Sequence, residues 1–429
     1  MSVISLIRGR EVLDSRGNPA VEAEVITTEG IFRAIVPSGS STGKYEAVEL
    51  RDRIANRYGG KGVLKAVKNI NEIIAPRLKG IDPTQQEEID NQLIKIDGTT
   101  NKKKLGANAL LAVSLAVCRA GASTKKVPLY LHIAQLSGTK QVTLPIPFFN
   151  IINGGKHAGN ALAFQEFMIV PVGAPNFKEA VRYGAEVYYQ LKKSIQEKYG
   201  TNAVQVGDEG GFAPPIKESE EALELLQRAI LKAGYQKNMR ISIDVAASEL
   251  YKKGKYNMHS KSGSQELKTV QEMMKKYSQY IKKYNLFSIE DPFDQDAWQS
   301  FIKITTQLGS KTKIVGDDIL VTNILRIKKA IQQNACNAII LKVNQIGTLT
   351  ESIQAAKIAK EANWDIIVSH RSGDTEDSFI ADLAVGLGAG YIKAGAPCRS
   401  ERTSKYNQLL RIEEELGEKA IFGAMHLRK

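Results

Sequence analysis

The 429-residue chain has few cysteines. Cys118, Cys336 and Cys398 are odd in number, lie far apart in the sequence, and form no Cys-x-x-Cys pair. Small secreted domains are usually stabilised by several disulfides, which this spacing does not offer. The pattern therefore favours a reduced, cytoplasmic setting.

Long apolar runs are also missing. No uninterrupted run approaches the roughly 20 residues that span a bilayer. The nearest candidate, residues 107–122, contains Arg119 and is predicted to be a buried helix. Residues 1–7 are too short for the apolar region of a secretory signal, and Arg8 and Arg10 follow them. We therefore expect neither a membrane span nor a secretory signal.

Acidic residues are in deficit, since 59 Lys and Arg against 46 Asp and Glu give a formal net charge of +13. Such a charge is compatible with a nucleic-acid partner. However, several lysines occur as scattered doublets, such as Lys192 with Lys193, and most of these doublets lie inside helical patterns, which is typical of solvated helix faces. A basic surface also raises encounter rates with anionic substrates. We expect no obligate nucleic-acid partner, although charge alone leaves both interpretations open.

The chain is long enough for two or three domains. Residues 20–27 and 30–36 have the alternation of strands, and residues 63–78 and 108–122 have helical spacing. Ser137 and Gly138 form a turn signal that marks the end of this part. We predict an α+β domain over residues 1–138 and a second domain over residues 139–429.

The second part has a repeated pattern, in which short apolar runs end in a polar group and amphipathic helical stretches lie between most of them. The runs precede Asp208 with Glu209, Asp244, Glu290, Asp317, Lys342, His370 and Lys393. This alternation predicts parallel strands with helical crossovers, hence an α/β fold and a TIM-type barrel with its site at the carboxyl ends of the strands. A doubly wound open sheet is the alternative, but it concentrates ligand contacts at one switch point.

Three acids, Asp244, Glu290 and Asp317, end successive predicted strands. Carboxylates that converge at one mouth repel each other unless a cation holds them, and hard oxygen ligands suit Mg²⁺. The alternative is that each is an ordinary surface acid in a loop. That alternative suits one acid better than it suits three in the same position.

Lys342 follows the apolar run Ala338 to Leu341, and Lys393 is placed similarly. Burial and a nearby cation both favour the neutral amine, which can act as a base. A buried salt bridge to a neighbouring carboxylate is an equally good interpretation of Lys342. The sequence leaves the two open.

Ser369, His370, Arg371, Ser372 and Gly373 precede a helix that we predict to begin near Thr375. A guanidinium and a serine at a helix N-terminus are suited to a phosphate group. A serine in this position is also an ordinary helix cap.

Glycine-rich segments at residues 37–43, 153–159 and 207–211 resemble mobile loops over a site. None matches the Gly-x-x-x-x-Gly-Lys-Ser/Thr phosphate loop. Ordinary turns are the alternative. They are disfavoured because the second and third segments carry His157 and the acids Asp208 and Glu209.

Several of these segments together resemble one family. Residues 13–19, 206–211, 288–293, 341–347, 369–373 and 405–417 are similar, in family order, to enolases. The resemblance extends from about Ile4 to Gly417, and residues 396–402 are closer to the eukaryotic branch. It implies an N-terminal α+β capping domain on a C-terminal barrel, and a homodimer in which Arg10, Glu22, Arg411 and Glu414 form ion pairs across the interface.

The resemblance also implies an activity, the reversible dehydration of 2-phosphoglycerate to phosphoenolpyruvate in glycolysis and gluconeogenesis, with two Mg²⁺ per active site. Asp244, Glu290 and Asp317 would hold one ion, and Ser41 would bind the second. Lys342 would remove the C2 proton, while Glu209, assisted by Glu166, would protonate the departing C3 hydroxyl. The implied substrate-binding residues are His157, Glu166, Glu290, Asp317, Ser369, His370, Arg371, Ser372 and Lys393. Of these, His157 would close over the substrate, Arg371 and Ser372 would bind its phosphate, and Lys393 its carboxylate.

Two loop residues depart from the family pattern, since Ser40 replaces a usual alanine and Lys156 a usual small residue. Loop closure is the property that these changes affect most. Two other functions compete with the enolase reaction. One is a sugar-acid dehydratase on the same barrel; the other is plasminogen binding through a C-terminal lysine, for which Lys429 is a weak signal.

Overall fold

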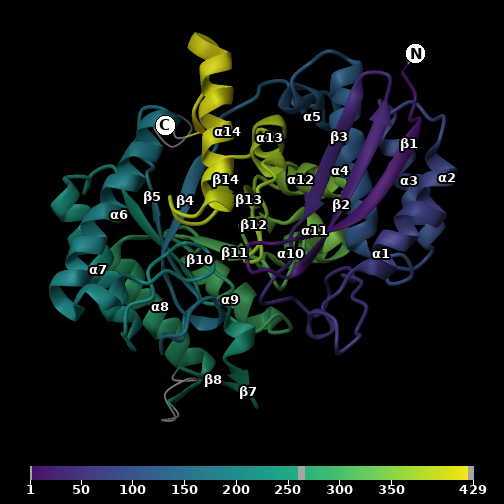
Figure 1. Ribbon diagram of the computed structural model, residues 1–429. Coiled ribbons are helices and arrows are strands. Elements are labelled where there is room, and N and C mark those ends of the chain that lie inside the picture. Colours follow the sequence, from purple (N-terminus) through teal and green to yellow (C-terminus); the bar gives the residue numbers. More distant parts are fainter. Residues whose placement is uncertain (1, 259–265, 424–429) are drawn as a thin grey trace.

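A computed structural model describes residues 2–258 and 266–423 of the chain. The C-terminal Lys429, and with it the plasminogen hypothesis, lies outside the described residues. The N-terminal part forms an antiparallel sheet backed by helices, and it sits beside a β/α barrel that occupies the rest of the chain (Figure 1).

The N-terminal sheet has the order β1 (Leu6–Leu13), β2 (Pro19–Thr27) and β3 (Gly30–Val36). Strands β2 and β3 confirm the predicted segments, whereas β1 was not predicted. Helix α4 (Ala107–Thr124) packs on β2 and β3. By length and composition α4 is able to cross a membrane, but 83% of it is buried inside the molecule. It is therefore the core helix that the sequence predicts.

The other N-terminal helices are short. They are η1 (Tyr58–Gly60), α1 (Leu64–Lys68), the π-helical η2 (Asn69–Ile74), α2 (Ala75–Leu78), α3 (Gln86–Asp97) and α5 (Leu129–Ser137). The stretch from α1 through η2 to α2 confirms the helical spacing of residues 63–78.

The barrel is closed, and in the described part of the chain it has eight strands in the order β10-β11-β12-β13-β14-β4-β5-β6. This confirms the TIM-type barrel and excludes the open sheet. The strands are β4 (Ile146–Asn153), β5 (Glu166–Val170), β6 (Arg240–Asp244), β10 (Leu286–Glu290), β11 (Lys313–Gly316), β12 (Ala338–Leu341), β13 (Asp365–Ser369) and β14 (Tyr391–Lys393). The last six carry the polar strand ends that the sequence predicts.

One strand departs from the predicted parallel arrangement. Strand β5 runs antiparallel to both β4 and β6. The connection from β4 to β5, residues 154–165, contains only the short η3 (Gly155–His157), whereas a parallel return usually needs a crossover helix. As a consequence, the first residue of β5, Glu166, lies opposite Asp244 at the carboxyl end of β6.

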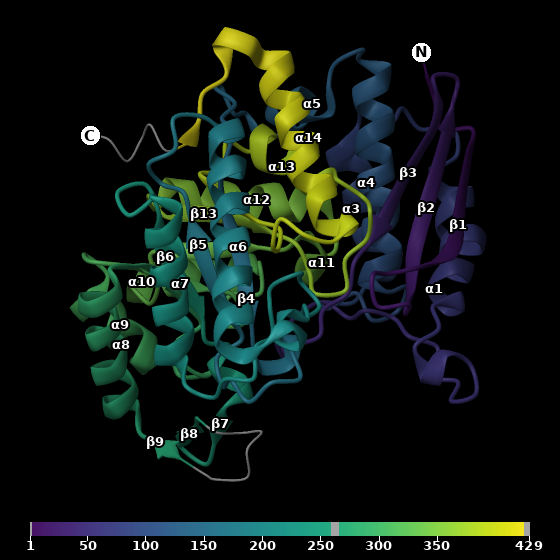
Figure 2. The ribbon, with the colours of Figure 1, turned by 60° about the vertical axis from the view of Figure 1, so that its left-hand side comes forward.

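Helices surround the barrel in both views (Figures 1 and 2). They are α6 (Phe177–Tyr199), α7 (Ser219–Ala233), α8 (Val270–Tyr284), α9 (Trp298–Leu308), α10 (Ile324–Gln333), α11 (Val343–Ile346), α12 (Leu349–Glu361), α13 (Phe379–Gly386) and α14 (Ser400–Leu416). Smaller elements are η4 (Thr201–Val204), η5 (Ala247–Glu249), η6 (Gly417–Lys419) and a small sheet of β7 (Tyr251–Lys252), β8 (Lys255–Asn257) and β9 (Leu267–Lys268).

Two local predictions were wrong. The run before Asp208 is not a barrel strand, because it forms η4 and then a single bridge between Val206 and Phe212. Helix α13 begins at Phe379 rather than near Thr375. The preceding residues are held in a loop by the N-terminal domain, where Ser38 pairs with Gly373.

Polar contacts tie the N-terminal domain to the barrel. Arg119 binds Asp377 through two N–H···O bonds of 2.7 Å, and Lys102 Nζ lies 2.9 Å from Glu351. Asp90 accepts hydrogen bonds from the backbone and hydroxyl of Thr350. These contacts hold the N-terminal domain against the barrel.

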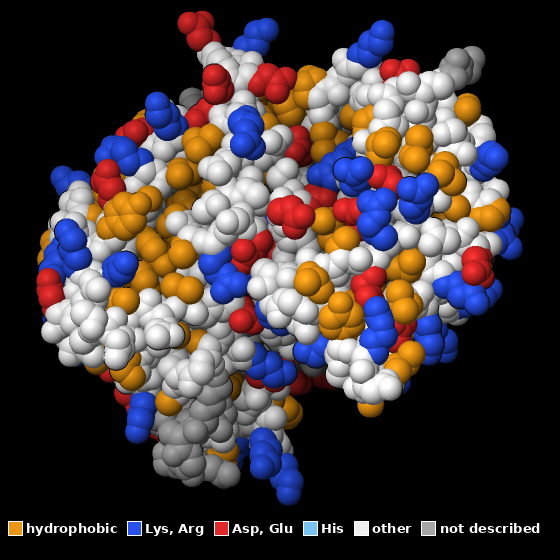
Figure 3. Space-filling model, viewed as in Figure 1, with side chains coloured by type: hydrophobic (Ala, Val, Ile, Leu, Met, Phe, Trp, Pro, Cys, Tyr) orange, Lys and Arg blue, Asp and Glu red, His pale blue; other side chains and the backbone are white. Residues whose placement is uncertain are grey.

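The basic side chains do not gather in one place on the face shown in Figure 3. There, Lys and Arg are interspersed with acidic and apolar side chains. This arrangement is typical of a solvated surface.

Candidate active site

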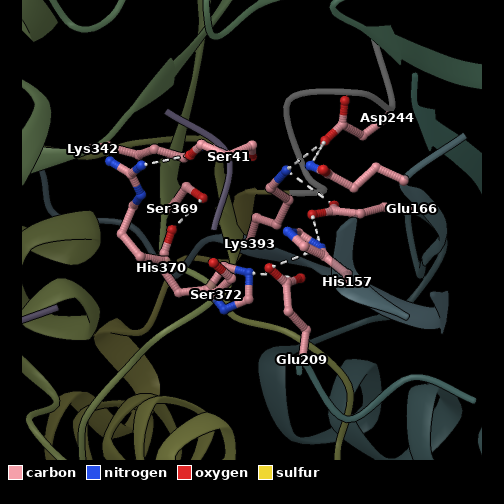
Figure 4. Close-up of a pocket in the computed structure, with 12 residues that line it drawn as sticks. Ser41, His157, Glu166, Glu209, Asp244, Lys342, Ser369, His370, Ser372 and Lys393 are labelled. Carbon is pink, nitrogen blue, oxygen red and sulfur yellow. Dashed lines mark hydrogen bonds and ion pairs between the residues drawn. The ribbon is translucent and has the colours of Figure 1, made fainter. Parts of the chain in front are cut away.

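A small cavity of about 10 Å³ lies at the carboxyl ends of the barrel strands (Figure 4). Its lining is almost entirely polar. The lining residues are Ser41, His157, Gln165, Glu166, Glu209, Asp244, Lys342, Ser369, His370, Arg371, Ser372 and Lys393. The cavity has room for about one water molecule, so a larger molecule enters only if the surrounding loops move.

Lys393, the last residue of β14, lies at the centre of a carboxylate cluster. Its Nζ is 2.8 Å from both oxygens of Glu290, 3.0 Å from Glu166 and 3.9 Å from Asp244. Burial alone would lower the pKa of Lys393, but Glu166 and Glu290 raise it well above its usual value. Lys393 is therefore a fixed cation at the floor of the site.

Lys342, which follows β12, forms a buried ion pair with Asp317. Burial lowers the pKa of Lys342, yet the attraction of Asp317 outweighs burial and raises it. Of the two interpretations that the sequence leaves open, the salt bridge therefore describes this state. Lys342 can become a base only when Asp317 is engaged elsewhere.

The buried acids suit a divalent cation. Glu166, Asp244 and Glu290 offer oxygens within 4.8 Å of one another, and Asp291, Asp317 and Asp318 form a second such group. Burial, with help from Glu166, raises the pKa of Asp244 to about 8, and burial and repulsion by Asp244 raise the pKa of Glu290 to about 8. Carboxyls that resist ionisation together are stabilised by an added positive charge, so this hard oxygen set fits Mg²⁺.

A second pair of acids meets at His157. Its Nδ1 is 3.5 Å from Glu166 and 3.4 Å from Glu209. Burial and repulsion by Glu209 raise the pKa of Glu166 well above its usual value. Burial also acts on Glu209, but His370 and His157 outweigh it and lower its pKa. Of the two carboxyls, Glu166 therefore binds a proton more readily than Glu209.

His370 is oriented by Arg402 of α14. The guanidinium donates to His370 Nδ1 at 2.6 Å, and His370 Nε2 lies 3.2 Å from Glu209 Oε2. Burial lowers the pKa of His370 to about 4, so the ring is neutral near pH 7. Because arginine only donates, the ring proton is on Nε2 and faces Glu209.

The first glycine-rich loop is closed over the cavity. The Ser41 carbonyl accepts a hydrogen bond of 3.1 Å from Arg371, whose guanidinium also binds Glu46 at 2.9 Å. Gly39 is required here, because a Cβ at this position would collide with the Arg371 guanidinium. Loop closure therefore depends on Arg371 from the barrel.

The structure brings the predicted site residues together. Eleven line the cavity, and the remaining two, Glu290 and Asp317, pair with Lys393 and Lys342 directly beside it. Sequence reasoning missed Gln165, which donates to Asp244 at 3.3 Å, and Gln345, which donates to Asp317 at 2.8 Å. It also missed Arg402. The amides lie within or beside recognisable motifs, but no residue pattern marked them as partners of the acids.

Fold and site together define a β/α-barrel enzyme whose buried carboxylates suit a divalent cation. Residues 4–133 match the family described as "Enolase, N-terminal domain", and residues 141–429 match "Enolase, C-terminal TIM barrel domain". The chain is also similar to "Enolase" of Solanum lycopersicum, with 57% identity over 441 residues that cover 100% of this chain and 99% of the relative.

The chain belongs to the enolase family. It is accordingly a lyase, a phosphopyruvate hydratase with the glycolytic function of that family. The alternative of a sugar-acid dehydratase on the same barrel is thereby disfavoured.

Proposed function

We propose that this chain dehydrates 2-phosphoglycerate to phosphoenolpyruvate with Lys342 as the base and the Glu209–Glu166 pair as the acid. The observation that carries the proposal is the placement of these groups around one small cavity. Figure 4 draws Lys342 and Glu209 on different sides of Lys393. A base and an acid that are kept apart do not neutralise each other.

Lys342 removes the C2 proton in its neutral form. Its partner Asp317 keeps it charged in the present arrangement, so Asp317 must be drawn away before Lys342 can act. Deprotonation beside a carboxylate places a second negative charge on the substrate. Lys393 is placed to stabilise that charge, since it stays protonated among the carboxylates.

The acid step is assigned to the pair rather than to one member. Glu166 and Glu209 both lie within 3.5 Å of His157. The pKa is raised for Glu166 and lowered for Glu209, so Glu166 is the member that takes up a proton more readily. Protonation of the C3 hydroxyl turns a poor leaving group into water. Asn150 donates a hydrogen bond of 2.9 Å to Glu209 Oε2 and orients that carboxyl, and His370 Nε2 lies 3.2 Å from the same oxygen.

The remaining groups bind the anionic substrate. Arg371 and Ser372 are proposed to bind phosphate, with Ser369, His370 and His157 around the substrate. The predicted helix N-terminus does not contribute, because α13 begins at Phe379. Arg371 is therefore the main positive group proposed for this role, and it must share its N–H donors between Glu46 and phosphate.

We propose that Asp244, Glu290 and Asp317 hold one Mg²⁺ and that Ser41 binds a second. When bound, Mg²⁺ supplies positive charge that stabilises the negative charge developing on the substrate carboxylate. Asp244 and Glu290 offer oxygens in one buried group with Glu166, whereas Asp317 lies in the other group with Asp291 and Asp318. Support for a shared ion comes from repulsion, because burial raises the pKa of Asp244 and of Glu290 and the charge of Asp317 adds to both shifts. The Ser41 carbonyl is held by Arg371 at the edge of the same cavity.

Assembly and setting are also proposals. We propose a homodimer in the cytoplasm, with residues 1–138 as the cap and residues 139–429 as the catalytic barrel. Within the chain, Arg10 already pairs with Glu22, so the dimer contact would add Arg411 to an existing pair. Cys118 and Cys336 are free and buried, which suits a reducing compartment.

The test is an absorbance assay of enol formation from 2-phosphoglycerate with Mg²⁺. A signal that a chelator abolishes supports the reaction and its metal together. We expect Lys342→Ala and Glu209→Gln each to reduce kcat by at least about 10²-fold, the usual worth of general acid–base catalysis. Near-normal turnover in a folded variant would remove that residue from the proposed role.

A further inference from the structure

Ser40, in the first glycine-rich loop, contacts three other segments of the chain. Its backbone N–H donates to Ser372 Oγ at 2.6 Å. Its hydroxyl accepts a hydrogen bond from the Arg16 guanidinium and donates to Asp208 Oδ2 at 3.3 Å. The hydroxyl of Ser40 therefore joins Arg16 of the N-terminal domain to the loop that carries Glu209, and its backbone N–H adds the loop after β13.

Arg16 is itself fixed within the N-terminal domain. It lies in the turn between β1 and β2, donates to Ser38 Oγ at 3.1 Å and is 3.7 Å from Asp14. The direct separation of Arg16 and Asp208 is 3.9 Å, which is too long for a hydrogen bond. The Ser40 hydroxyl bridges the guanidinium and the carboxylate.

Asp208 extends the connection to the acid groups. It directly precedes Glu209, and its backbone N–H donates to the carbonyl of His157 at 3.1 Å. Its own carbonyl accepts a hydrogen bond of 3.0 Å from Arg402. The three glycine-rich loops are thus linked in series, from Ser40 through Asp208 to His157.

We propose that Ser40 is a positioning residue that couples closure of the first loop to the placement of Glu209 and His157. The cavity of about 10 Å³ is too small to admit a phosphorylated three-carbon acid, so the loops must open and close again during turnover. Ser40 makes Ser41 and the acid pair come into place together. The catalytic consequence rests on the proposed function, whereas the coupling of the loops does not.

An alanine at position 40 keeps the backbone bond to Ser372 and loses both hydroxyl bonds, each of which has a charged partner. Hydrogen exchange of the full-length protein in Mg²⁺ buffer is the direct test. In Ser40→Ala we expect amide exchange to rise several-fold in residues 37–46 and also in residues 205–213.

Two variants keep the test specific. Ser40→Thr retains the hydroxyl and is expected to restore slow exchange in both segments. Thr42→Ala removes an exposed hydroxyl of the same loop that bonds to no residue the structure describes, and it is expected to exchange like the wild type. Faster exchange in residues 37–46 alone, or in neither segment, would overturn the coupling.

Steady-state kinetics supplies the second readout. Because closure draws on binding free energy, Ser40→Ala is expected to raise KM for 2-phosphoglycerate about 2- to 10-fold, the range of one or two net hydrogen bonds, with kcat changed less than KM. A fall in kcat with unchanged KM would place Ser40 in the chemistry and overturn the positioning role. If Ser40→Ala raises exchange in both segments but the wild type does not turn over 2-phosphoglycerate, the proposed function is refuted and the coupling of the loops is still supported.

Discussion

Arg402 donates a hydrogen bond to His370 Nδ1 at 2.6 Å, and by doing so it selects the tautomer of that ring. The same guanidinium donates to the carbonyls of Arg371 and Ser372 at 2.6 Å each. Arg402 is fully buried, so these bonds are not exchanged with water. One residue of α14 thus holds both the ring that faces Glu209 and the backbone of the proposed phosphate site.

This relationship predicts the effect of Arg402→Lys. Lysine keeps the charge but lacks the planar fork, so it cannot serve all three acceptors at once. We expect the His370 ring to lose its fixed Nε2–H tautomer and kcat to fall about 10-fold or more, as is usual when a residue that orients an active-site ring is changed. Nitrogen NMR shifts of the ring report the tautomer. His132, which lies apart from this group, is the internal control, and an unchanged His370 spectrum would contradict the prediction.

Lys156 in the second loop forms a second contact that holds a loop closed. Lys156 directly precedes His157, and its Nζ lies 2.7 Å from Glu249 in η5. The Lys156 side chain is 49% exposed, so the pair is worth only about 0.2–1 kcal/mol and is screened by salt. We expect Lys156→Ser to raise KM by up to about 5-fold at low salt and to match the wild type at high salt.

The matched control for Lys156→Ser is Lys68→Ser, which breaks an exposed ion pair with Glu72 far from the loops. If KM differs between Lys156→Ser and the wild type by the same factor at low and high salt, the Lys156–Glu249 ion pair is not what holds the loop closed. An equal effect of Lys68→Ser would show that general charge, rather than the Glu249 contact, is responsible.

Metal binding should appear as a gain in stability. A ligand present at about 100 times its Kd stabilises the folded state by roughly 2.7 kcal/mol. We expect Mg²⁺ to raise the Tm of the wild type and a chelator to reverse the gain. Asp244→Asn should lose most of this increase, because an amide cannot supply the negative charge with which an ionised Asp244 would bind the cation. Glu87→Gln, on the exposed face of α3, should keep it. An Asp244→Asn protein with the full Mg²⁺ response would exclude Asp244 as a ligand.

The burial of His132 predicts that the folded protein becomes less stable in acid. His132 is fully buried in α5, and neither ring nitrogen has a hydrogen-bond partner in the described residues. Burial lowers its pKa from 6.5 to about 4. Between these two pH values the unfolded chain binds the proton at His132 more tightly than the folded chain does. The contribution of His132 to the free energy of unfolding is therefore complete above pH 6.5 and is lost as the pH falls towards 4. The difference amounts to at most about 3 kcal/mol.

The substitution His132→Leu tests this contribution, because it replaces an unpartnered ring with an apolar side chain. We expect the drop in Tm between pH 7 and pH 5 to be smaller in the variant than in the wild type. Some drop should remain, since burial also lowers the pKa of His157 and His370. An identical drop in both proteins would mean that His132 is not the sensitive group.

Much of the architecture follows from local sequence patterns. The apolar runs before Asp244, Glu290, Lys342 and Lys393 are buried, as is typical of strands in a parallel sheet that is covered on both faces. The polar residue that ends each run then falls at one face of the barrel. Strand ends and part of the site were therefore predictable without any knowledge of contacts.

The sequence by itself determined the alternation of strands and helices, the barrel and most of the acids at its mouth, because these depend on residues close together in the chain. Only the tertiary structure decided that β5 runs antiparallel and brings Glu166 opposite Asp244. It also decided that Asp317 keeps Lys342 charged and that Arg402 selects the His370 tautomer. Protonation and orientation depend on the distances between segments far apart in the chain, and no local pattern encodes those distances.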